Sequence, residues 1–327
     1  MIKAIAITGP TASGKTALSI DIAGRIGAEI ISADSMQIYK EMDIGTAKAT
    51  EGEQAAVPHH MIDVVSPLES FSVEAYRERA LIAARDITAR GLVPLFVGGT
   101  GLYVDSFTRS SQSDAPMSDP AYRDRLLAQY VGEQGRLELW RRLTEIDPES
   151  AEKIHYNNVK RVIRALEIYD TTGVTKSELD RRSKEKSTEI DVGMVTLDFH
   201  ERELLYSRID KRVGMMLDDG LVSEVESLYK RGLLPDGTTA SQAIGYKELI
   251  GYIRGECTLD EAADAIRLAS RRYAKRQLTW FRHRGDACRV FVDDGAGKMR
   301  NFADVSDEIF AFINNFLSHG SVNERKL

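Results

Sequence analysis

The sequence predicts an α/β fold in which a parallel β-sheet with flanking helices is interrupted by a helical insertion. Short runs rich in Ile, Val and Ala, the composition of strands buried on both faces, alternate with segments whose apolar residues recur at helical spacing. From about residue 113 to 190 only helical patterns occur, and a strand pattern then returns. We therefore expect an α/β core from residues 1–112 and 191–315, an insertion domain at 113–190 and a disordered tail at 316–327.

The first strand leads into the most specific motif of the chain. Residues 2–8 predict a buried strand, and residues 9–16 read G-P-T-A-S-G-K-T, which fits G-x-x-x-x-G-K-[ST]. Helical spacing follows at Leu18, Ile22 and Ile26. Backbone N–H groups in such a loop close around phosphate oxygens, and the helix N-terminus adds a positive field. The order predicts a P-loop NTPase-like core that binds a diphosphate or polyphosphate; the alternative is a chance glycine turn.

The expected phosphate site has two specialised side chains. Lys15 supplies a cation for the outer phosphate, and the Thr16 hydroxyl is suited to ligate Mg²⁺. The residues that we expect to bind the phosphates are Gly9, Thr11, Ala12, Ser13, Gly14, Lys15 and Thr16.

The second predicted strand, residues 28–33, ends directly before Asp34. Ligands of open parallel sheets bind outside the carboxyl ends of the strands, which favours a functional Asp34 near the P-loop over a loop aspartate that caps a helix. Residues 43–63 predict an irregular excursion. Its adjacent histidines, His59 and His60, face opposite ways on an extended chain, so we expect no shared metal.

A helix predicted at 73–90 leads to a third strand at 92–97, which ends in G-G-T-G-L-Y. Glycines at a strand end permit close approach to a ligand, and Thr100 is placed to form a hydrogen bond through its hydroxyl. A plain tight turn is the competing interpretation. A linker rich in Ser, Asp and Pro is then expected at 110–120.

The insertion predicts helices at 120–131, 136–145, from 148 onward, and 158–172. In the last of these, Lys160, Arg161 and Arg164 share one side, and no acidic residue lies between Lys153 and Leu166. Such a face is either an ordinary solvated surface or a surface for an anionic ligand, and the missing acids favour the ligand.

The remainder is mostly helical, with a final short strand at 288–292, and its most informative segment is a long helix at 259–282. Arg271, Lys275 and Arg282 fall on the arc opposite an apolar arc that includes Tyr273 and Trp280. Six Lys or Arg residues and no acidic residue occur from Arg271 to Arg284. In an acidic protein this pattern indicates a footprint for a phosphate backbone.

The overall composition is that of a soluble globular protein. The 327 residues are 29% charged and 43% hydrophobic, and the formal net charge of −6 argues against a protein that coats nucleic acid indiscriminately. The two cysteines, Cys257 and Cys288, form no C-x-x-C pair, which fits a reducing cytosol. No apolar run approaches the ~18 residues of a membrane span. We expect a cytoplasmic monomer that does not bind membranes.

The motifs together resemble the bacterial tRNA dimethylallyltransferases, which modify adenosine 37 of tRNA. The resemblance covers residues 1 to about 315 and rests on an ordered set of segments: the P-loop at 9–16, S-A-D-S-M-Q-I-Y at 32–39, D-I-G-T-A-K at 43–48, V-P-H-H at 57–60, V-G-G-T-G-L-Y at 97–103, R-V-I-R-A-L-E at 161–167, Q-A-I-G-Y-K-E at 242–248 and Y-A-K-R-Q-L-T-W-F-R at 273–282. Ala49 and Asn158 depart from the family's usual residues, which affects local loops.

This resemblance implies dimethylallyl diphosphate as donor, the N6 amine of adenine 37 as acceptor, and Mg²⁺ as cofactor. It implies Asp34 as the base, Thr100 near the diphosphate or the amine, and Arg208 of the R-I-x-x-R segment as the arginine on the leaving diphosphate. Independently of the resemblance, we expect Gln277 or Thr279 of the long helix to be able to touch bases. The residues expected to contact tRNA are Asp34, Ser35, Met36, Gln37, Thr100, Arg123, Lys160, Arg161, Arg164, Gln242, Gly245, Tyr246, Lys247, Arg271, Lys275, Arg276, Gln277, Thr279, Trp280 and Arg282.

Other functions share parts of this pattern. A P-loop small-molecule kinase would have the same first strand, loop and helix, but needs arginines that face a γ-phosphate. A relative that prenylates free AMP leaves the insertion and the basic terminal helix unexplained. A non-catalytic RNA-binding protein is disfavoured by the intact P-loop beside Asp34.

Overall fold

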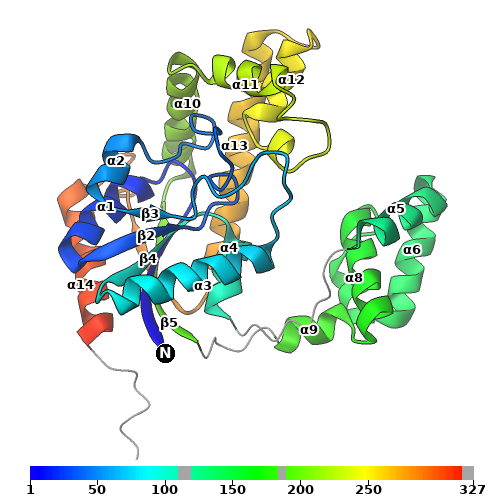
Figure 1. Cartoon of the computed structure of the whole chain (residues 1–327), viewed down its shortest axis with the longest axis horizontal. Helices are drawn as coiled ribbons and strands as arrows, with labels where there is room; N and C mark the ends of the chain where they lie inside the picture. The colour runs from blue at the N-terminus through cyan, green and yellow to red at the C-terminus, as the bar shows by residue number, and fades with distance from the viewer. Residues whose placement is uncertain (110–118, 183–188, 319–327) are drawn as a thin grey trace, which may run out of the picture. The chain divides into compact units, whose positions relative to one another are not determined.

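The computed structural model describes residues 1–109, 119–182 and 189–318, which form two compact units (Figure 1). Unit 1 consists of residues 1–106 and 189–327, and unit 2 of residues 107–188. In the described residues no helix is long and apolar enough to cross a membrane.

Unit 1 is built on one six-stranded sheet in which every pairing is parallel. The strands are β1 (Ile2–Thr8), β2 (Ala28–Ser32), β3 (His59–His60), β4 (Val93–Gly98), β5 (Ile190–Asp198) and β6 (Ala287–Phe291), in the order β3-β2-β4-β1-β5-β6. The last residue of β1, Thr8, is in register with Gly98 of β4 and Thr196 of β5. The loops after β1, β2 and β4 therefore leave the same edge of the sheet, which confirms the predicted α/β class.

The helices of unit 1 are α1 (Lys15–Ile26), α2 (Glu51–Ala56), α3 (Val73–Ala89), α4 (Gly101–Thr108), α10 (Arg202–Asp218), α11 (Leu221–Lys230), α12 (Tyr246–Ile253), α13 (Leu259–Arg282) and α14 (Phe302–Ser318). Helices α1 and α14 pack together on one face of the sheet, and α3 covers the other (Figure 1). Ile5 and Ile7 of β1 belong to the core beneath α1 and α14, as alternation along a strand requires.

The bounds of β1 and α13 agree with the sequence prediction, and Ser72 caps α3 as expected by accepting a hydrogen bond from Ala75 N. One prediction of irregular structure was wrong. Residues 43–63 contain α2, which Thr50 and Glu53 stabilise through a capping box, and the short strand β3. The glycine-rich turn after β4 continues into α4.

Unit 2 is helical, with α5 (Pro120–Gln129), α6 (Gly132–Ile146), α7 (Pro148–Lys153), α8 (Val159–Thr172) and α9 (Lys176–Arg182). Both α5 and α7 begin with Pro behind an Asp that caps the helix. The buried side of α8 supplies Val162, Ile163 and Leu166 to the core of the unit. The predicted linker falls mostly on residues 110–118, outside the described residues.

The expected start of the tail needs a correction. Residues 316–318 belong to α14, where Phe316 packs on the sheet core and the Leu317 carbonyl accepts a hydrogen bond of 3.2 Å from Lys3 Nζ. These contacts anchor the last turn of the helix. Residues 319–327 lie outside the described residues.

Candidate active site

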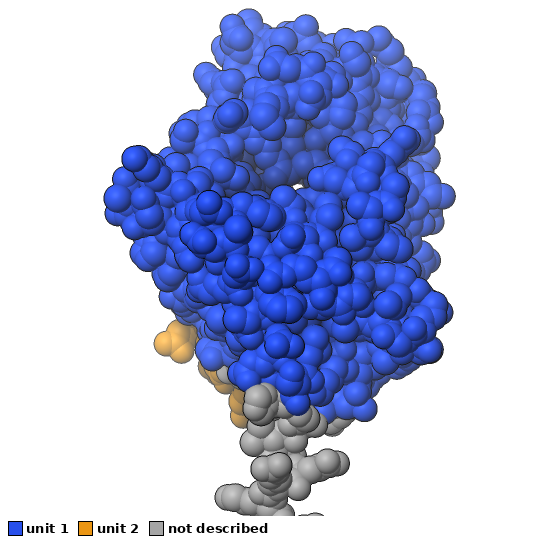
Figure 2. Space-filling model, turned by 90° about the vertical axis from the view of Figure 1, so that its left-hand side faces the viewer, with its two compact units in different colours: residues 1–106, 189–327 blue, residues 107–188 orange. Residues whose placement is uncertain are grey.

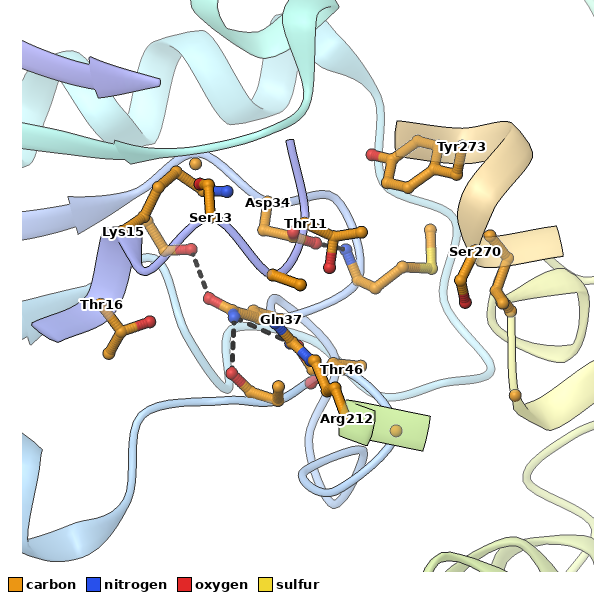
Figure 3. A pocket seen from close by; sticks show the side chains of 18 of the residues that line it. Thr11, Ser13, Lys15, Thr16, Asp34, Gln37, Thr46, Arg212, Ser270 and Tyr273 are labelled. Atoms are coloured by element: carbon orange, nitrogen blue, oxygen red, sulfur yellow. Dashed lines mark hydrogen bonds between the residues drawn. The ribbon is translucent and has the colours of Figure 1, made fainter. Parts of the chain in front are cut away.

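A cavity of about 560 Å³ lies in unit 1 at the edge of the sheet where the strands end. Its wall is formed by the P-loop, the segment after β2, the loop at 242–245, and side chains of α10 and α13. Figure 2 shows the left-hand side of the molecule in Figure 1, where the surface of unit 1 is hollowed between its upper and lower parts. Figure 3 shows Lys15, Asp34, Arg212 and Tyr273 around this space.

The P-loop has a conformation that its sequence supports. Gly9 has φ +142°, and a Cβ at this position would lie 2.8 Å from the Leu197 carbonyl oxygen, so only glycine fits. Ala12 also has a positive φ, 61°. The Ser13 hydroxyl is buried without a hydrogen-bond partner among the described residues. A buried donor of this kind, in a loop of backbone N–H groups that precedes a helix, is suited to an anion.

Lys15 lies in the same loop and faces the cavity. Its Nζ donates to the carbonyl oxygens of Gly9 at 3.0 Å and Pro10 at 2.6 Å. Burial, together with the positive charge of Arg212, lowers the pKa of Lys15 to about 7, although Asp34 opposes the shift. A cationic cavity that lowers the pKa of its own lysine favours the arrival of a negatively charged ligand.

The segment after β2 brings a carboxylate to the cavity. Asp34 Oδ1 accepts from Met36 N at 2.9 Å, which fixes the carboxylate in a local turn. Thr100 does not line the cavity, but its Oγ1 accepts from Ser35 N at 3.0 Å. Thr100 therefore connects the turn after β4 to the segment that carries Asp34.

Tyr273 of α13 also lines the cavity, close to Asp34. Burial raises the pKa of Tyr273 to about 12, and the nearby charge of Asp34 adds to the rise. The phenol is therefore a proton donor at neutral pH.

Comparisons with known proteins identify the family. A family model described as IPP transferase matches residues 37–284, and another described as isopentenyl transferase matches residues 2–70. The tRNA dimethylallyltransferases of Shouchella clausii and Bacillus pumilus are each 47% identical to this chain, over 94% of it and over 96% and 94% of their own lengths. The chain belongs to the tRNA dimethylallyltransferase family.

Solved structures of the family agree with the fold. The full-length tRNA isopentenylpyrophosphate transferase of Bacillus halodurans is 42% identical to this chain. The match covers 97% of each chain and has a TM-score of 0.71. A eukaryotic dimethylallyltransferase, described as acting on tRNA, is 27% identical and has a TM-score of 0.81 over 99% of this chain and 82% of its own. The core is thus P-loop NTPase-like, as in these relatives.

The two arginines of the R-I-x-x-R segment have different positions. Arg208 does not line the cavity; its Nε donates to the Ala12 carbonyl at 2.8 Å and supports the P-loop. Arg212, one turn later on α10, lines the cavity near Asp34 and is partly buried. The sequence analysis did not select Arg212, although its spacing of four from Arg208 was a usable signal.

Two residues expected to contact tRNA have their polar groups occupied within the chain. The Gln37 side chain donates to the carbonyls of Thr46 and Ala47 and accepts from Ser32 Oγ, so it holds the neighbouring loop. Tyr246 is fully buried, and its hydroxyl donates to Glu224 Oε1 at 2.5 Å. Tyr246 was therefore wrongly assigned to the RNA surface.

Glu224 was not found from the sequence because its partners are remote in the chain. Its carboxylate accepts from three successive backbone N–H groups, those of Asp43, Ile44 and Gly45. It thereby fixes the D-I-G-T-A-K segment on α11. In that segment Lys48 is buried and pairs with Asp43 and Asp63, at 2.5 and 2.6 Å.

Several basic residues expected to contact tRNA are paired with acids within the chain. On α13, Arg271 donates to Asp210 and Arg282 to Asp198, at 2.9 Å in each case. In unit 2, Arg123 and Arg164 donate to the buried carboxylate of Glu167, at 2.8 and 2.7 Å. A search of neighbouring sequence for acids misses these partners, because three of the four pairs join separate helices or strands.

Other basic residues are exposed and make no ion pair within the described residues. They are Lys160 and Arg161 on α8, Lys247 on α12, and Lys275 and Arg276 on α13. Beside the last two, Thr279 and Trp280 are also exposed. Of the 242–248 segment, Gln242 and Gly245 line the cavity.

The long helix also carries a buried amide that was expected to face bases. Gln277 is 4% exposed, its Oε1 accepts from Thr11 N at 2.9 Å, and its Nε2 donates to the Gly99 carbonyl at 3.0 Å. Both ends of the amide are thus occupied by main chain. Gln277 also lines the cavity, so its contact with bases stays a prediction, although its polar atoms are satisfied within the chain.

No group of three or more His, Cys, Asp or Glu side chains that could hold a metal occurs in the described part of the chain. His60 bonds Glu29 at 2.7 Å, and His59 bonds the Val57 carbonyl at 2.7 Å, so the two rings have different partners. The Thr16 hydroxyl lines the cavity beside the P-loop. A hydroxyl next to bound phosphates fits Mg²⁺, which keeps several waters and needs few protein ligands.

Proposed function

We propose that this chain transfers the dimethylallyl group of dimethylallyl diphosphate to N6 of adenosine 37 in the anticodon loop of a tRNA and releases diphosphate. The observation that carries the proposal is that one cavity joins a P-loop, two cations and a carboxylate in a chain of this family. The P-loop alone would suit many phosphate ligands.

The diphosphate fits the end of the cavity that holds Lys15, Ser13 and Arg212. As the bond between the allylic C1 and the bridging oxygen breaks, negative charge collects on the departing diphosphate. Lys15, Arg212 and the P-loop line this part of the cavity, and their positive charge and N–H groups would stabilise that charge. Arg208 holds the P-loop from behind through the Ala12 carbonyl.

The dimethylallyl group fits the apolar part of the same wall. Side chains from α10, α11 and α13 meet there: Ile209, Val213, Met216, Leu221 and Ile266. A five-carbon group is buried by such a wall, and water that would compete with the amine is excluded.

The acceptor amine would approach Asp34. A new bond forms between N6 and C1 while the bond from C1 to the diphosphate oxygen breaks, and the amine must lose one proton. The lone pair of this amine is delocalised into the purine, so removal of the proton as the bond forms assists the attack. Asp34 is held in place by Met36 N and by the Thr100–Ser35 contact, and it takes the proton in this scheme.

Mg²⁺ belongs to the proposal as a partner of the diphosphate. Thr16 would hold it together with the phosphate oxygens, and it would neutralise charge on the leaving group.

The exposed Lys275, Arg276, Thr279 and Trp280 of α13, with Lys160 and Arg161 of unit 2, are proposed to contact the RNA. Adenine 37 must leave the base stack of the loop to enter the cavity. We propose that the protein acts as a monomer. We place the protein in the cytoplasm, where its RNA substrate would be.

The test is mass spectrometry of tRNA nucleosides after incubation of the protein with dimethylallyl diphosphate, Mg²⁺ and tRNA. We expect dimethylallyl adenosine from a tRNA with adenosine 37 and none from a matched tRNA with guanosine there. Modification of free AMP in preference to tRNA, or phosphoryl transfer from ATP without prenylation, would contradict the proposal.

A further inference from the structure

Gln277 connects three parts of unit 1 that are distant in sequence. Its side chain joins α13 to the P-loop through Thr11 N and to the turn after β4 through the Gly99 carbonyl. The contact is close, because a Cβ on Gly99 would lie 2.1 Å from Gln277 Nε2. The turn at Gly99 continues to Thr100, which holds Ser35 next to Asp34.

The opposite side of the same two turns of α13 faces solvent through Lys275 and Thr279. Arg276 and Trp280 are exposed on the flank next to Gln277, and Arg276 also lines the cavity. A ligand that binds this outer side therefore contacts a helix whose inner side carries the amide that holds the P-loop. Movement of α13 by a fraction of an ångström changes the two hydrogen bonds of Gln277, since their strength depends steeply on geometry.

We propose that Gln277 is a positioning residue that couples RNA binding on the outer side of α13 to diphosphate binding at the P-loop. The inference rests on the proposed function, because it takes the outer side of α13 as an RNA surface. Gln277 lines the cavity, but both polar ends of its amide bond main chain, so in this scheme it acts through the P-loop and the turn after β4. It fixes the P-loop at Thr11, and through Gly99 and Thr100 it fixes the segment with Asp34. The diphosphate part and the acceptor part of the site are therefore positioned by the same side chain.

Coupling of this kind is reciprocal in binding free energy and is measured as a change in affinity. We would titrate the protein with inorganic diphosphate and Mg²⁺, with and without a saturating anticodon stem-loop. For the wild-type protein we expect the stem-loop to tighten diphosphate binding by about fivefold or more, the lower end of typical couplings. Gln277→Met keeps the length of the side chain and removes both hydrogen bonds. In this variant the diphosphate affinities with and without the stem-loop should differ by less than about twofold.

Two further variants separate positioning from folding. Gln277→Glu can still accept from Thr11 N but cannot donate to Gly99 O at neutral pH, so it should keep part of the coupling. Leu268→Gln changes an exposed residue on the same helix and should leave the coupling at the wild-type ratio. Stem-loop affinity itself should change less than about threefold in both Gln277 variants, since the outer side of α13 is intact.

A measurement on the wild-type protein covers the case in which neither Gln277 variant folds. The stem-loop alone, without diphosphate, should slow hydrogen exchange of the amides at residues 9–14, because the Thr11 N–H is the one that Gln277 accepts. Unchanged exchange in this segment, absence of coupling in the wild-type protein, or full coupling in folded Gln277→Met would each overturn the inference. A wild-type protein that does not prenylate tRNA would instead refute the proposed function.

Discussion

Lys15 and Arg212 face the same cavity from two elements that are almost two hundred residues apart in the chain. The positive charge of Arg212 adds to the effect of burial and brings the pKa of Lys15 to about 7. The pair is thus electrostatically unfavourable in the free protein, and a diphosphate between them relieves the repulsion. Four of the following predictions concern this cavity.

Lys15→Ala should abolish turnover of dimethylallyl diphosphate and leave RNA affinity within about twofold of wild type. Lys15 faces the cavity, whereas the proposed RNA contacts are exposed side chains elsewhere. Steady-state turnover and fluorescence titration with an anticodon stem-loop measure the two effects. Equal losses of turnover and of RNA affinity in a folded variant would refute this division.

Diphosphate affinity should depend on pH through Lys15. The free protein holds Lys15 half-protonated near pH 7, and the bound diphosphate favours the charged ammonium. Affinity should therefore fall as the pH rises above about 7, with a slope approaching tenfold per pH unit. Calorimetric titration with inorganic diphosphate between pH 6 and 9 measures this pH dependence of the affinity. The variant Lys15→Arg stays charged over this range, so its profile corrects for ionisation of the diphosphate itself. Parallel profiles for the two proteins would rule out Lys15 as the titrating group.

The two arginines of α10 should differ in the step that they affect. Arg212 lines the cavity, so Arg212→Gln should weaken diphosphate binding and slow transfer by roughly 10²-fold, the effect of one lost charge stabiliser. Arg208→Gln removes a hydrogen bond to Ala12 and should cost less in binding, because the lost contact is to the protein itself. Single-turnover rates and diphosphate affinities of the matched pair decide the order. The reverse order would restore Arg208 as the arginine on the leaving group.

Asp34→Asn should slow the chemical step by ~10²–10⁴, the usual effect of removing a general base. The amide is similar in shape to the carboxylate and its oxygen still accepts from Met36 N, so the local turn is retained. The measurement is a single-turnover assay with both substrates saturating. A rate close to wild type would exclude Asp34 as the base.

Exposed and ion-paired basic residues should respond differently to replacement. Lys275→Ala and Arg161→Ala each remove an exposed cation, so each should weaken stem-loop binding and lower the slope of log K against log salt by ~0.7–0.9. Arg282→Ala instead leaves the buried Asp198 with one fewer partner and should lower the melting temperature. Stem-loop titrations at several salt concentrations and thermal unfolding test the contrast. If Lys275→Ala and Arg161→Ala left both affinity and slope unchanged, these residues would be ordinary solvated surface.

The sequence by itself determined the α/β class, the positions of β1 and α13, the P-loop and the family. These features depend on local order: apolar periodicity, caps such as Ser72, and motifs whose residues are neighbours in the chain. The P-loop conformation is local as well, since Gly9 and Gly14 supply the positive φ angles that the turn requires.

Only the tertiary structure decided which polar side chains are available to a ligand. Gln277 and Arg282 belong to a stretch of α13 that is basic and polar in sequence. In the structure Gln277 is bonded to main chain at Thr11 and Gly99, and Arg282 is paired with Asp198. The physical reason is that a side chain's hydrogen-bond and ion-pair partners are set by packing between remote elements. Periodicity gives the face of a helix on which a residue lies, but not what that face packs against.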